Sequence, residues 1–231
     1  MKSYRVKFLL IFIILTLNIH AKDFAILLDT SASMNGNNKI PYARLSVGIF
    51  LNLLDENDRL TLITFNEEAN VQYRLTNINR RNRDDIITTL ERLTGNYRTN
   101  FIKPLELLNT RPGKDSEEQN EMVIIFVTDG NHKQHNYDQL PINDPYIEEK
   151  KKECRKEVID FLNINYKGKN CRIYTIGVGE EKGNEKIDQE LLREIANIGG
   201  GKFIFAKEPK SLIDTLINIC WGEKEYLRCN E

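Results

Sequence analysis

The stretch Asp23–Ser33, with the sequence DFAILLDTSAS, joins an apolar run to a polar turn. After Asp23, the residues from Phe24 through Leu28 are all apolar, which is typical of a strand covered on both faces of a sheet. The sequence then changes abruptly to Asp29 and the hydroxyl residues that follow it. In open α/β sheets ligands bind at the carboxyl ends of the strands, so this stretch predicts a ligand site.

Similar apolar runs recur along the chain, with helical patterns between most of them. We expect strands at 23–28, 59–65, 70–75, 121–128, 172–178 and 202–205. We expect helices at 39–54, 84–93, 100–108, 147–163, 189–197 and 211–219. This alternation predicts a doubly wound α/β fold, a mostly parallel sheet with helices on both faces. The alternating polarity of 70–75 is typical of an antiparallel edge strand.

Oxygen-bearing side chains follow two of these strands. Asp29 ends the first, and Asp129 comes directly after EMVIIFVT at 121–128. Ser31 and Ser33 lie two residues apart on a turn, and Thr99 immediately precedes an expected helix. Carboxylate and hydroxyl oxygens are ligands for hard cations, so the pattern predicts a site for Mg²⁺, with Mn²⁺ or Ca²⁺ as alternatives.

The pattern Asp29-x-Ser31-x-Ser33, followed by Thr99 and by Asp129-Gly130, resembles the metal-ion-dependent adhesion site (MIDAS) of von Willebrand factor A (vWA) domains. The similarity extends from about residue 23 to about residue 220. It implies a vWA/Rossmann-like sheet of six strands in the order 3-2-1-4-5-6, with one antiparallel edge strand.

The resemblance also implies roles for these residues. Ser31, Ser33 and Thr99 would bind the ion through their side chains, and Asp29 and Asp129 directly or through water. A carboxylate from a protein partner would complete the coordination shell. The function implied is adhesion or protein–protein interaction without turnover, so we expect a binding protein and not an enzyme.

Residues beside the expected ligands in sequence are expected to form a partner-binding rim: Asn35, Asn37, Tyr97, Arg98, Asn100, Asn131 and His132. The pair His132 and His135 has three open interpretations, namely solvated loop residues, rim residues or a zinc site.

The amino-terminal segment indicates export. Lys2, Arg5 and Lys7 precede the apolar run 8–17, and Ala21 provides a small residue before a polar stretch. This pattern predicts a signal peptide at 1–21, with an N-terminal membrane anchor as the alternative. A vWA domain at 22–222 and a C-terminal tail at 223–231 would follow. Cleavage after Ala21 would change the net charge from −1 to −4, because it removes three basic residues and no acid.

No other apolar run approaches the length of a membrane span, so the mature chain is expected to be secreted or periplasmic. In such a compartment the four cysteines are expected to form disulfides. We expect Cys171 to pair with Cys220 or Cys229. Cys154 lies about ten residues, or about 15 Å, before the end of its expected helix, which is too far for a direct bridge to Cys171 just after that helix.

Other function classes fit less well. A net charge of −1 disfavours nucleic-acid binding. One alternative is a metal-assisted phosphohydrolase with Asp29 as nucleophile, but the second acid such enzymes place two residues later is here Ser31. The other alternative is a scaffold subunit that keeps the fold without using a metal.

Overall fold

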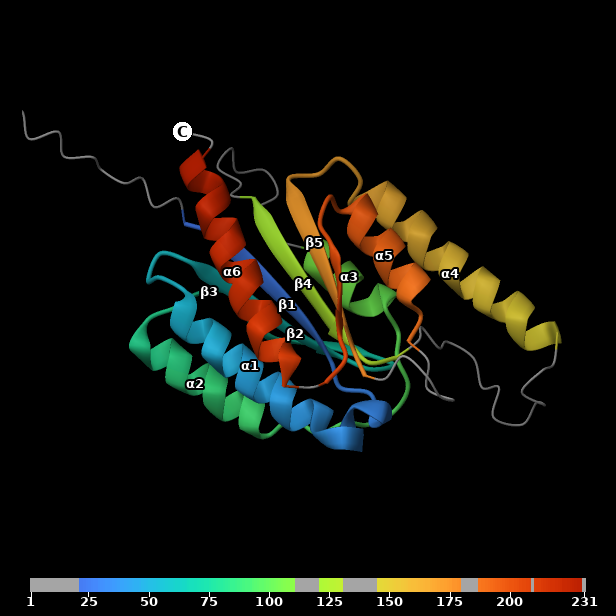
Figure 1. Ribbon diagram of the computed structural model, residues 1–231, viewed down its shortest axis with the longest axis horizontal. Coiled ribbons are helices and arrows are strands. Elements are labelled where there is room, and N and C mark those ends of the chain that lie inside the picture. Colours follow the sequence, from blue (N-terminus) through green and yellow to red (C-terminus); the bar gives the residue numbers. More distant parts are fainter. Residues whose placement is uncertain (1–20, 111–120, 131–144, 180–186, 209, 230–231) are drawn as a thin grey trace, which may run out of the picture.

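Six strands form one sheet in the order β3-β2-β1-β4-β5-β6, as predicted (Figure 1). The structure, a computed structural model, describes residues 21–110, 121–130, 145–179, 187–208 and 210–229. The strands are β1 (Asp23–Asp29), β2 (Arg59–Phe65), β3 (Ala69–Asn77), β4 (Met122–Thr128), β5 (Cys171–Val178) and β6 (Phe203–Ala206). All neighbouring strands are parallel except β3, which pairs antiparallel with β2 at the edge of the sheet.

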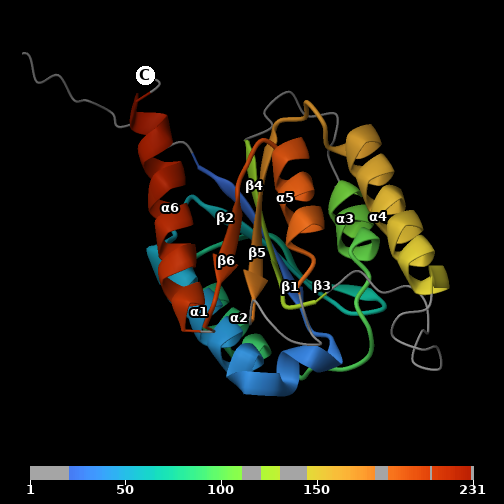
Figure 2. The same cartoon turned by 45° about the vertical axis from the view of Figure 1, so that its right-hand side comes forward.

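Helices cover both faces of this sheet (Figure 2). One face carries α1 (Lys39–Leu53), α2 (Arg80–Glu91) and α6 (Ser211–Cys229). The other carries α3 (Ile102–Asn109), α4 (Pro145–Asn165) and α5 (Gln189–Ile198). A short 3-10 segment, η1 (Ala32–Asn38), connects β1 to α1. The predicted mostly parallel α/β fold with helices on both faces is therefore confirmed.

Alternation along the central strands divides the core into two layers. In β1, Phe24, Ile26 and Leu28 pack on the α1/α6 face, whereas Ala25 and Leu27 pack on the α3/α5 face. Every residue of β1 and of β4 is buried, which explains why both strands are apolar without interruption. Burial of each large apolar side chain contributes roughly 1.5–3 kcal/mol, so these two strands anchor the fold.

The strand order reverses between β1 and β4, which are parallel neighbours with Leu28 opposite Val127. The chain moves outward from β1 through β2 to β3, and β4 then returns to the other side of β1. The carboxyl ends of β1 and β4 therefore lie side by side at the topological switch point, where ligands bind in open α/β sheets.

The last helix is longer than predicted. Apolar periodicity indicated an end at Ile219, but α6 continues to Cys229. The residues from 223 to 229, which we expected in the tail, are thus helical. In the extra turns Cys220 still packs in the apolar layer, Glu223 is buried against charged partners from the sheet, and Lys224 donates to the Leu53 carbonyl. The part of α6 after Ile219 is therefore held in part by polar contacts with distant residues, which the hydrophobic periodicity of the sequence does not reveal.

The structure contains no Cys171–Cys220 disulfide, because Cys220 is a free, buried thiol. Cys171 belongs to the core layer on the α3/α5 face and Cys220 to the layer under α6, so the sheet lies between them. The side chain of Cys229 lies outside the described residues, and its pairing with Cys171 stays a prediction.

Across the described ranges, no helix combines the length and the apolar character that crossing a membrane requires. The segment 1–20, which carries the signal-peptide prediction, lies outside the described residues.

Candidate functional site

Two buried carboxylates meet at the switch point. Asp29 is the last residue of β1, and Asp129 directly follows β4. Their exposed fractions are 0% and 3%. Burial of two neighbouring acids is unfavourable unless hydrogen bonds, cations or protons compensate their charges. The surroundings of each carboxylate therefore indicate what this site is built to hold.

Both oxygens of Asp29 accept hydrogen bonds. The Ser31 backbone N–H donates to Oδ1 at 2.7 Å, and the Thr128 hydroxyl donates to Oδ2 at 2.5 Å. Burial, together with the smaller effect of the negative charge of Asp129, raises the pKa of Asp29 to about 7 against the opposing hydrogen bonds from Thr128 and Ser31. Asp29 is thus held rigidly in a place where an added positive charge would be favourable.

The two serines connect the β1 turn to Asp129. Ser33 Oγ donates to Asp129 Oδ1 at 2.8 Å, and Ser31 Oγ lies 3.1 Å from Ser33 Oγ. Because the Ser33 proton is directed to the carboxylate, Ser31 is the donor to Ser33. The spacing of two residues therefore brings both hydroxyls to one side of the turn, as the sequence predicted.

Thr99 reaches the same place from a different loop. Tyr97 has a positive φ of 61°, and its carbonyl accepts from the Ala32 N–H at 2.9 Å. Gly95 packs so closely that a Cβ there would lie 2.5 Å from the Ser31 carbonyl oxygen. These contacts bind the loop before α3 to the turn after β1, and they place Thr99 beside the serines.

Gly130 shows how tightly these oxygens converge. A Cβ added to it would lie 3.4 Å from Thr99 Oγ1, 3.9 Å from Ser33 Oγ and 4.0 Å from Asp29 Oδ2. Three oxygens from two segments, the end of β1 with its turn and the loop before α3, thus surround one small space, and glycine leaves that space open. With Ser31 and Asp129 joined through Ser33, all five predicted residues gather in one cluster, which we call the oxygen cluster.

Lys39 is a member of the site that the sequence did not reveal. Its buried ammonium group contacts Asp129 Oδ2 and lies 3.4 Å from the Ser33 carbonyl oxygen. An ion pair inside a dry site compensates the Asp129 charge. In the sequence, Lys39 stands out only as part of an expected helix, so its contact with Asp129 could not be predicted. The hydrogen bond from Thr128 to Asp29 was not predicted either.

The cluster contains two carboxylates and three hydroxyls. Over the parts of the chain that the structure describes, no group of three or more His, Cys, Asp or Glu side chains could hold a metal ion. Any ion in the oxygen cluster would therefore depend on neutral hydroxyls as well as on Asp29 and Asp129.

The expected rim residues divide into two groups. Tyr97 is 70% exposed and Asn37 is exposed, so both are available to a partner. Asn35 is exposed, but its amide accepts from the Gly95 N–H and donates to the Gly95 carbonyl, so it also fixes the loop. Asn100, half-buried, accepts from the Ile102 N–H at the start of α3.

Arg98 is also half-buried beside these residues. Three further residues of the predicted rim and histidine pair lie outside the described residues: Asn131, His132 and His135.

Comparison with known proteins identifies the domain type. Residues 23–218 match the family model of the von Willebrand factor type A domain. The chain is 25% identical over 196 residues to the uncharacterized protein YfbK of Escherichia coli (strain K12), a match that covers 85% of this chain and 29% of that protein. The chain therefore spans less than a third of this relative's length.

Two solved structures share the fold. A von Willebrand factor type A protein from Catenulispora acidiphila superposes with a TM-score of 0.66 at 18% identity, covering 87% of this chain and 42% of that chain. Proximal thread matrix protein 1 from the mussel byssus, solved with a zinc-occupied MIDAS motif, gives a TM-score of 0.59 at 13% identity, covering 87% and 47%. At these identities the likeness shows the fold alone, and the zinc-occupied structure shows that a domain of this type can hold a divalent metal.

Proposed function

The chain belongs to the von Willebrand factor type A domain family, and we propose that it binds a protein partner through a divalent cation held by the oxygen cluster. Domains of this family generally serve as interaction modules and not as enzymes. The proposed ligands are the five predicted residues, Asp29, Ser31, Ser33, Thr99 and Asp129. The preferred ion is Mg²⁺, with Mn²⁺ or Ca²⁺ as alternatives.

The observation that carries this proposal is the convergence of side-chain oxygens around the space beside Gly130. Carboxylate and hydroxyl oxygens are the donors that small hard cations prefer, and Mg²⁺ keeps open positions that water or a partner oxygen fills. Buried Asp29 and Asp129 supply negative charge next to each other, which favours a cation between them. The residues present therefore fit the ion that the family implies.

Hydroxyl ligands have a chemical consequence. The three hydroxyl oxygens carry no charge, and Lys39 offsets part of the charge of Asp129, so a bound divalent ion keeps a positive charge that attracts a further anionic ligand. A carboxylate from an Asp or Glu of the partner suits this position. Exposed Tyr97 and Asn37 lie next to the cluster and offer contacts to the surface around that carboxylate.

We further propose that the protein acts outside the cytoplasm, after removal of the segment 1–21. The support is the basic and apolar pattern of that segment together with Ala21. A secreted or periplasmic location places the rim where an extracellular or envelope protein can reach it.

Metal binding is tested first without a partner. If free Mg²⁺ exceeds the dissociation constant 100-fold, the folded state gains about 2.7 kcal/mol, which corresponds to roughly 5–10 °C in Tm for a chain of this size. We expect this rise in Mg²⁺ relative to EDTA, and we expect Asp29→Ala to abolish it. The control is Asp160→Ala, which removes an exposed acid from α4. Equal Tm values in Mg²⁺ and EDTA for the unmodified protein would reject the proposal.

Partner binding is tested by capture from the native source in Mg²⁺ and in EDTA. A protein retained only in Mg²⁺, and lost with Asp29→Ala but not with Asp160→Ala, supports the proposal. Retention that is equal in EDTA would contradict a bridging ion.

A metal-independent scaffold is the second candidate, and the Lys39–Asp129 ion pair favours it because Lys39 already supplies a cation to the cluster. The Mg²⁺ and EDTA melts separate the two candidates. The phosphohydrolase hypothesis loses support, since Asp29 is fully buried and both of its oxygens accept hydrogen bonds, which lowers its nucleophilicity.

A further inference from the structure

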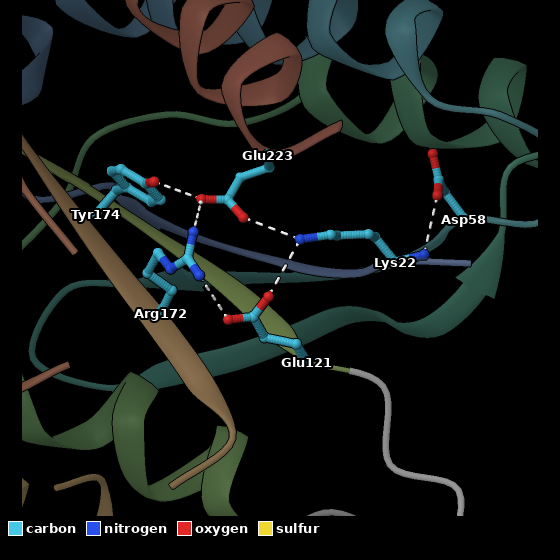
Figure 3. A network of polar contacts seen from close by, with 6 residues as sticks. All are labelled: Lys22, Asp58, Glu121, Arg172, Tyr174 and Glu223. Carbon is cyan, nitrogen blue, oxygen red and sulfur yellow. Dashed lines mark hydrogen bonds and ion pairs between the residues drawn. The ribbon is translucent and has the colours of Figure 1, made fainter. Parts of the chain in front are cut away.

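A buried network of charges lies at the end of the sheet opposite the oxygen cluster (Figure 3). Glu223 of α6, with an exposed fraction of 1%, accepts from Lys22 Nζ at 2.9 Å and from Arg172 at 2.8 Å. Glu121 bridges the same two cations, at 3.2 Å from Lys22 and 2.9 Å from Arg172. Tyr174 donates a hydrogen bond to Glu223.

The backbone of Lys22 belongs to this network as well as its side chain. The Lys22 N–H donates to Asp58 Oδ1 at 3.0 Å. Lys22 is 3% exposed and Asp58, which directly precedes β2, is equally buried. The second oxygen of Asp58 accepts from the Asp55 N–H at 2.8 Å and lies 3.2 Å from Lys224 Nζ. A buried carboxylate therefore faces the backbone nitrogen that follows Ala21.

The network has one carboxylate more than it has cations, counted over the described part of the chain. Its ion pairs connect three cations with four carboxylates, namely Lys22, Arg172 and Lys224 with Asp55, Asp58, Glu121 and Glu223. The neighbouring pair of Arg59 and Asp23 is balanced by itself. Asp55 is half exposed to solvent, so the surplus negative charge is only weakly unfavourable, but the buried carboxylate of Asp58 still favours a positive charge at the Lys22 nitrogen.

We propose that Asp58 binds the new amino terminus that is created when the Ala21–Lys22 bond is cleaved. This inference rests on the export part of the proposed function. A leader-removing protease and one water molecule break the bond between the Ala21 carbonyl carbon and the Lys22 nitrogen. Ala21 leaves with a carboxylate, and the nitrogen of Lys22 becomes an amine that takes up a proton near neutral pH, where α-amines have pKa values of about 7.7–8.0.

Cleavage converts an amide donor into an ammonium at the same place. The nitrogen that donates to Asp58 Oδ1 at 3.0 Å acquires a full charge and two further protons. The fourth cation then balances the fourth carboxylate. A charge-assisted hydrogen bond is roughly twice as strong as a neutral one, so the processed chain is more stable than its precursor.

The burial of Lys22 also fixes the order of events. A protease needs an accessible, extended segment, whereas Lys22 is buried once β1 has paired with β2. Cleavage therefore precedes folding, and the folded domain then encloses its own new terminus.

The test begins with the full chain expressed in a bacterial host that exports it. The intact mass of the exported protein is expected to correspond to a chain that begins at Lys22. A different amino terminus, or the absence of cleavage, would overturn the proposal.

The second measurement is the reactivity of the α-amine. In the native processed protein we expect acetic anhydride to acetylate Lys22 Nα at least tenfold more slowly than the same amine in the urea-unfolded protein, where its pKa of about 7.7–8.0 leaves it reactive. The exposed side chain of Lys103 should change its rate far less on unfolding. Mass spectrometry of the peptides that carry Lys22 and Lys103 gives these rates. A native rate for Lys22 Nα equal to its unfolded rate would overturn the proposal without the need for any variant.

The third measurement compares the processed protein with a full chain that carries Ala21→Leu, because a large residue before the cleavage point blocks removal of the leader. Asp58→Asn is expected to lower the Tm of the processed protein by roughly 4 °C more than that of the retained chain. The matched control is Asp23→Asn, which faces Arg59 and should cost both forms equally. An equal effect of Asp58→Asn on both forms would contradict a bound ammonium.

Mg²⁺ binding, measured on the same samples, keeps the two proposals separate. Loss of the Mg²⁺ response with a protected α-amine rejects the metal site alone. A reactive α-amine with an intact Mg²⁺ response rejects the terminus site alone.

Discussion

The ammonium group of Lys39 and a carboxylate oxygen of Asp129 are in direct contact inside the oxygen cluster. They come from different elements, since Lys39 begins α1 and Asp129 follows β4. A divalent ion that binds Asp129 must share this carboxylate with Lys39 or displace it. The contact therefore makes Lys39 an internal competitor of the metal.

Replacing Lys39 with Met removes this competing charge and keeps a long apolar stem. Two unit charges about 4 Å apart interact by about 4 kcal/mol at an effective dielectric constant of 20. We expect Lys39→Met to bind Mg²⁺ at least about tenfold more tightly, as measured by isothermal titration calorimetry. Lys103→Met, at an exposed position on α3, is the control and should leave the affinity unchanged. An unchanged or weaker affinity in Lys39→Met would show that the ammonium does not compete.

Thr99→Val removes one proposed ligand oxygen and nearly preserves the shape of the side chain. We expect the affinity for Mg²⁺ to fall about tenfold or more, because a methyl group cannot coordinate the ion. The Tm in EDTA should stay within about 3 °C of the unmodified protein, an effect of 1 kcal/mol or less. Wild-type affinity in Thr99→Val would exclude Thr99 as a ligand.

Glu223 is expected to stabilise the fold in a pH-dependent way. Burial opposes its ionisation, but hydrogen bonds from Tyr174 and Lys22 and the charges of Lys22 and Arg172 outweigh burial and hold the pKa of Glu223 below its usual range. A lowered folded-state pKa gives stability that is present above the unfolded-state pKa, near 4.3, and is lost as the pH falls through the folded-state pKa.

Glu223→Gln should therefore lower the free energy of unfolding at pH 7 by about 3–5 kcal/mol, the usual cost of removing one partner from a buried ion pair. Its stability should also decrease less steeply than that of the unmodified protein below about pH 4. Urea unfolding between pH 3 and pH 7 measures both effects. Glu106→Gln, which breaks an exposed pair with Lys103, should cost less than about 1 kcal/mol. Parallel pH curves for Glu223→Gln and the unmodified protein would be the contrary result.

Cys220 is expected to be unreactive in the folded protein. Burial raises the pKa of its thiol to about 11, with the charge of Lys224 acting in the opposite direction. At pH 8 almost no thiolate is present, so iodoacetamide should modify Cys220 only after unfolding. Non-reducing peptide mapping should likewise show no bridge between Cys220 and Cys171, and a Cys171–Cys220 peptide would contradict the structure.

Local patterns in the sequence predicted the mostly parallel sheet and the oxygen-bearing residues at its edge, whereas the strand order and the grouping of all five residues came from the resemblance to vWA domains. Uninterrupted apolar strands identify the centre of a parallel sheet, and residues that directly follow such strands must meet at its carboxyl edge. This rule places Asp29 and Asp129 at the same edge of the sheet, and predicting that shared edge required no further knowledge of the packing.

What the sequence did not predict depends on contacts between distant positions. Lys39 lies 90 positions from Asp129, and Lys22 lies 201 positions from Glu223. Lysine and glutamate on a helix are usually solvated, so periodicity assigned Lys39 no role and left Glu223 in a tail. Only the folded backbone shows that both side chains are buried opposite a partner of the other charge.

The ion pair between Lys22 and Glu223 joins the first residue before β1 to the last helix, at the end of the sheet remote from the oxygen cluster. Both ends of the described domain thus lie at one pole, remote from the oxygen cluster. Domains with neighbouring ends tolerate insertion and fusion. This vWA domain can therefore be attached to a stalk, a surface or another protein through its carboxyl end, with its proposed binding face directed outward.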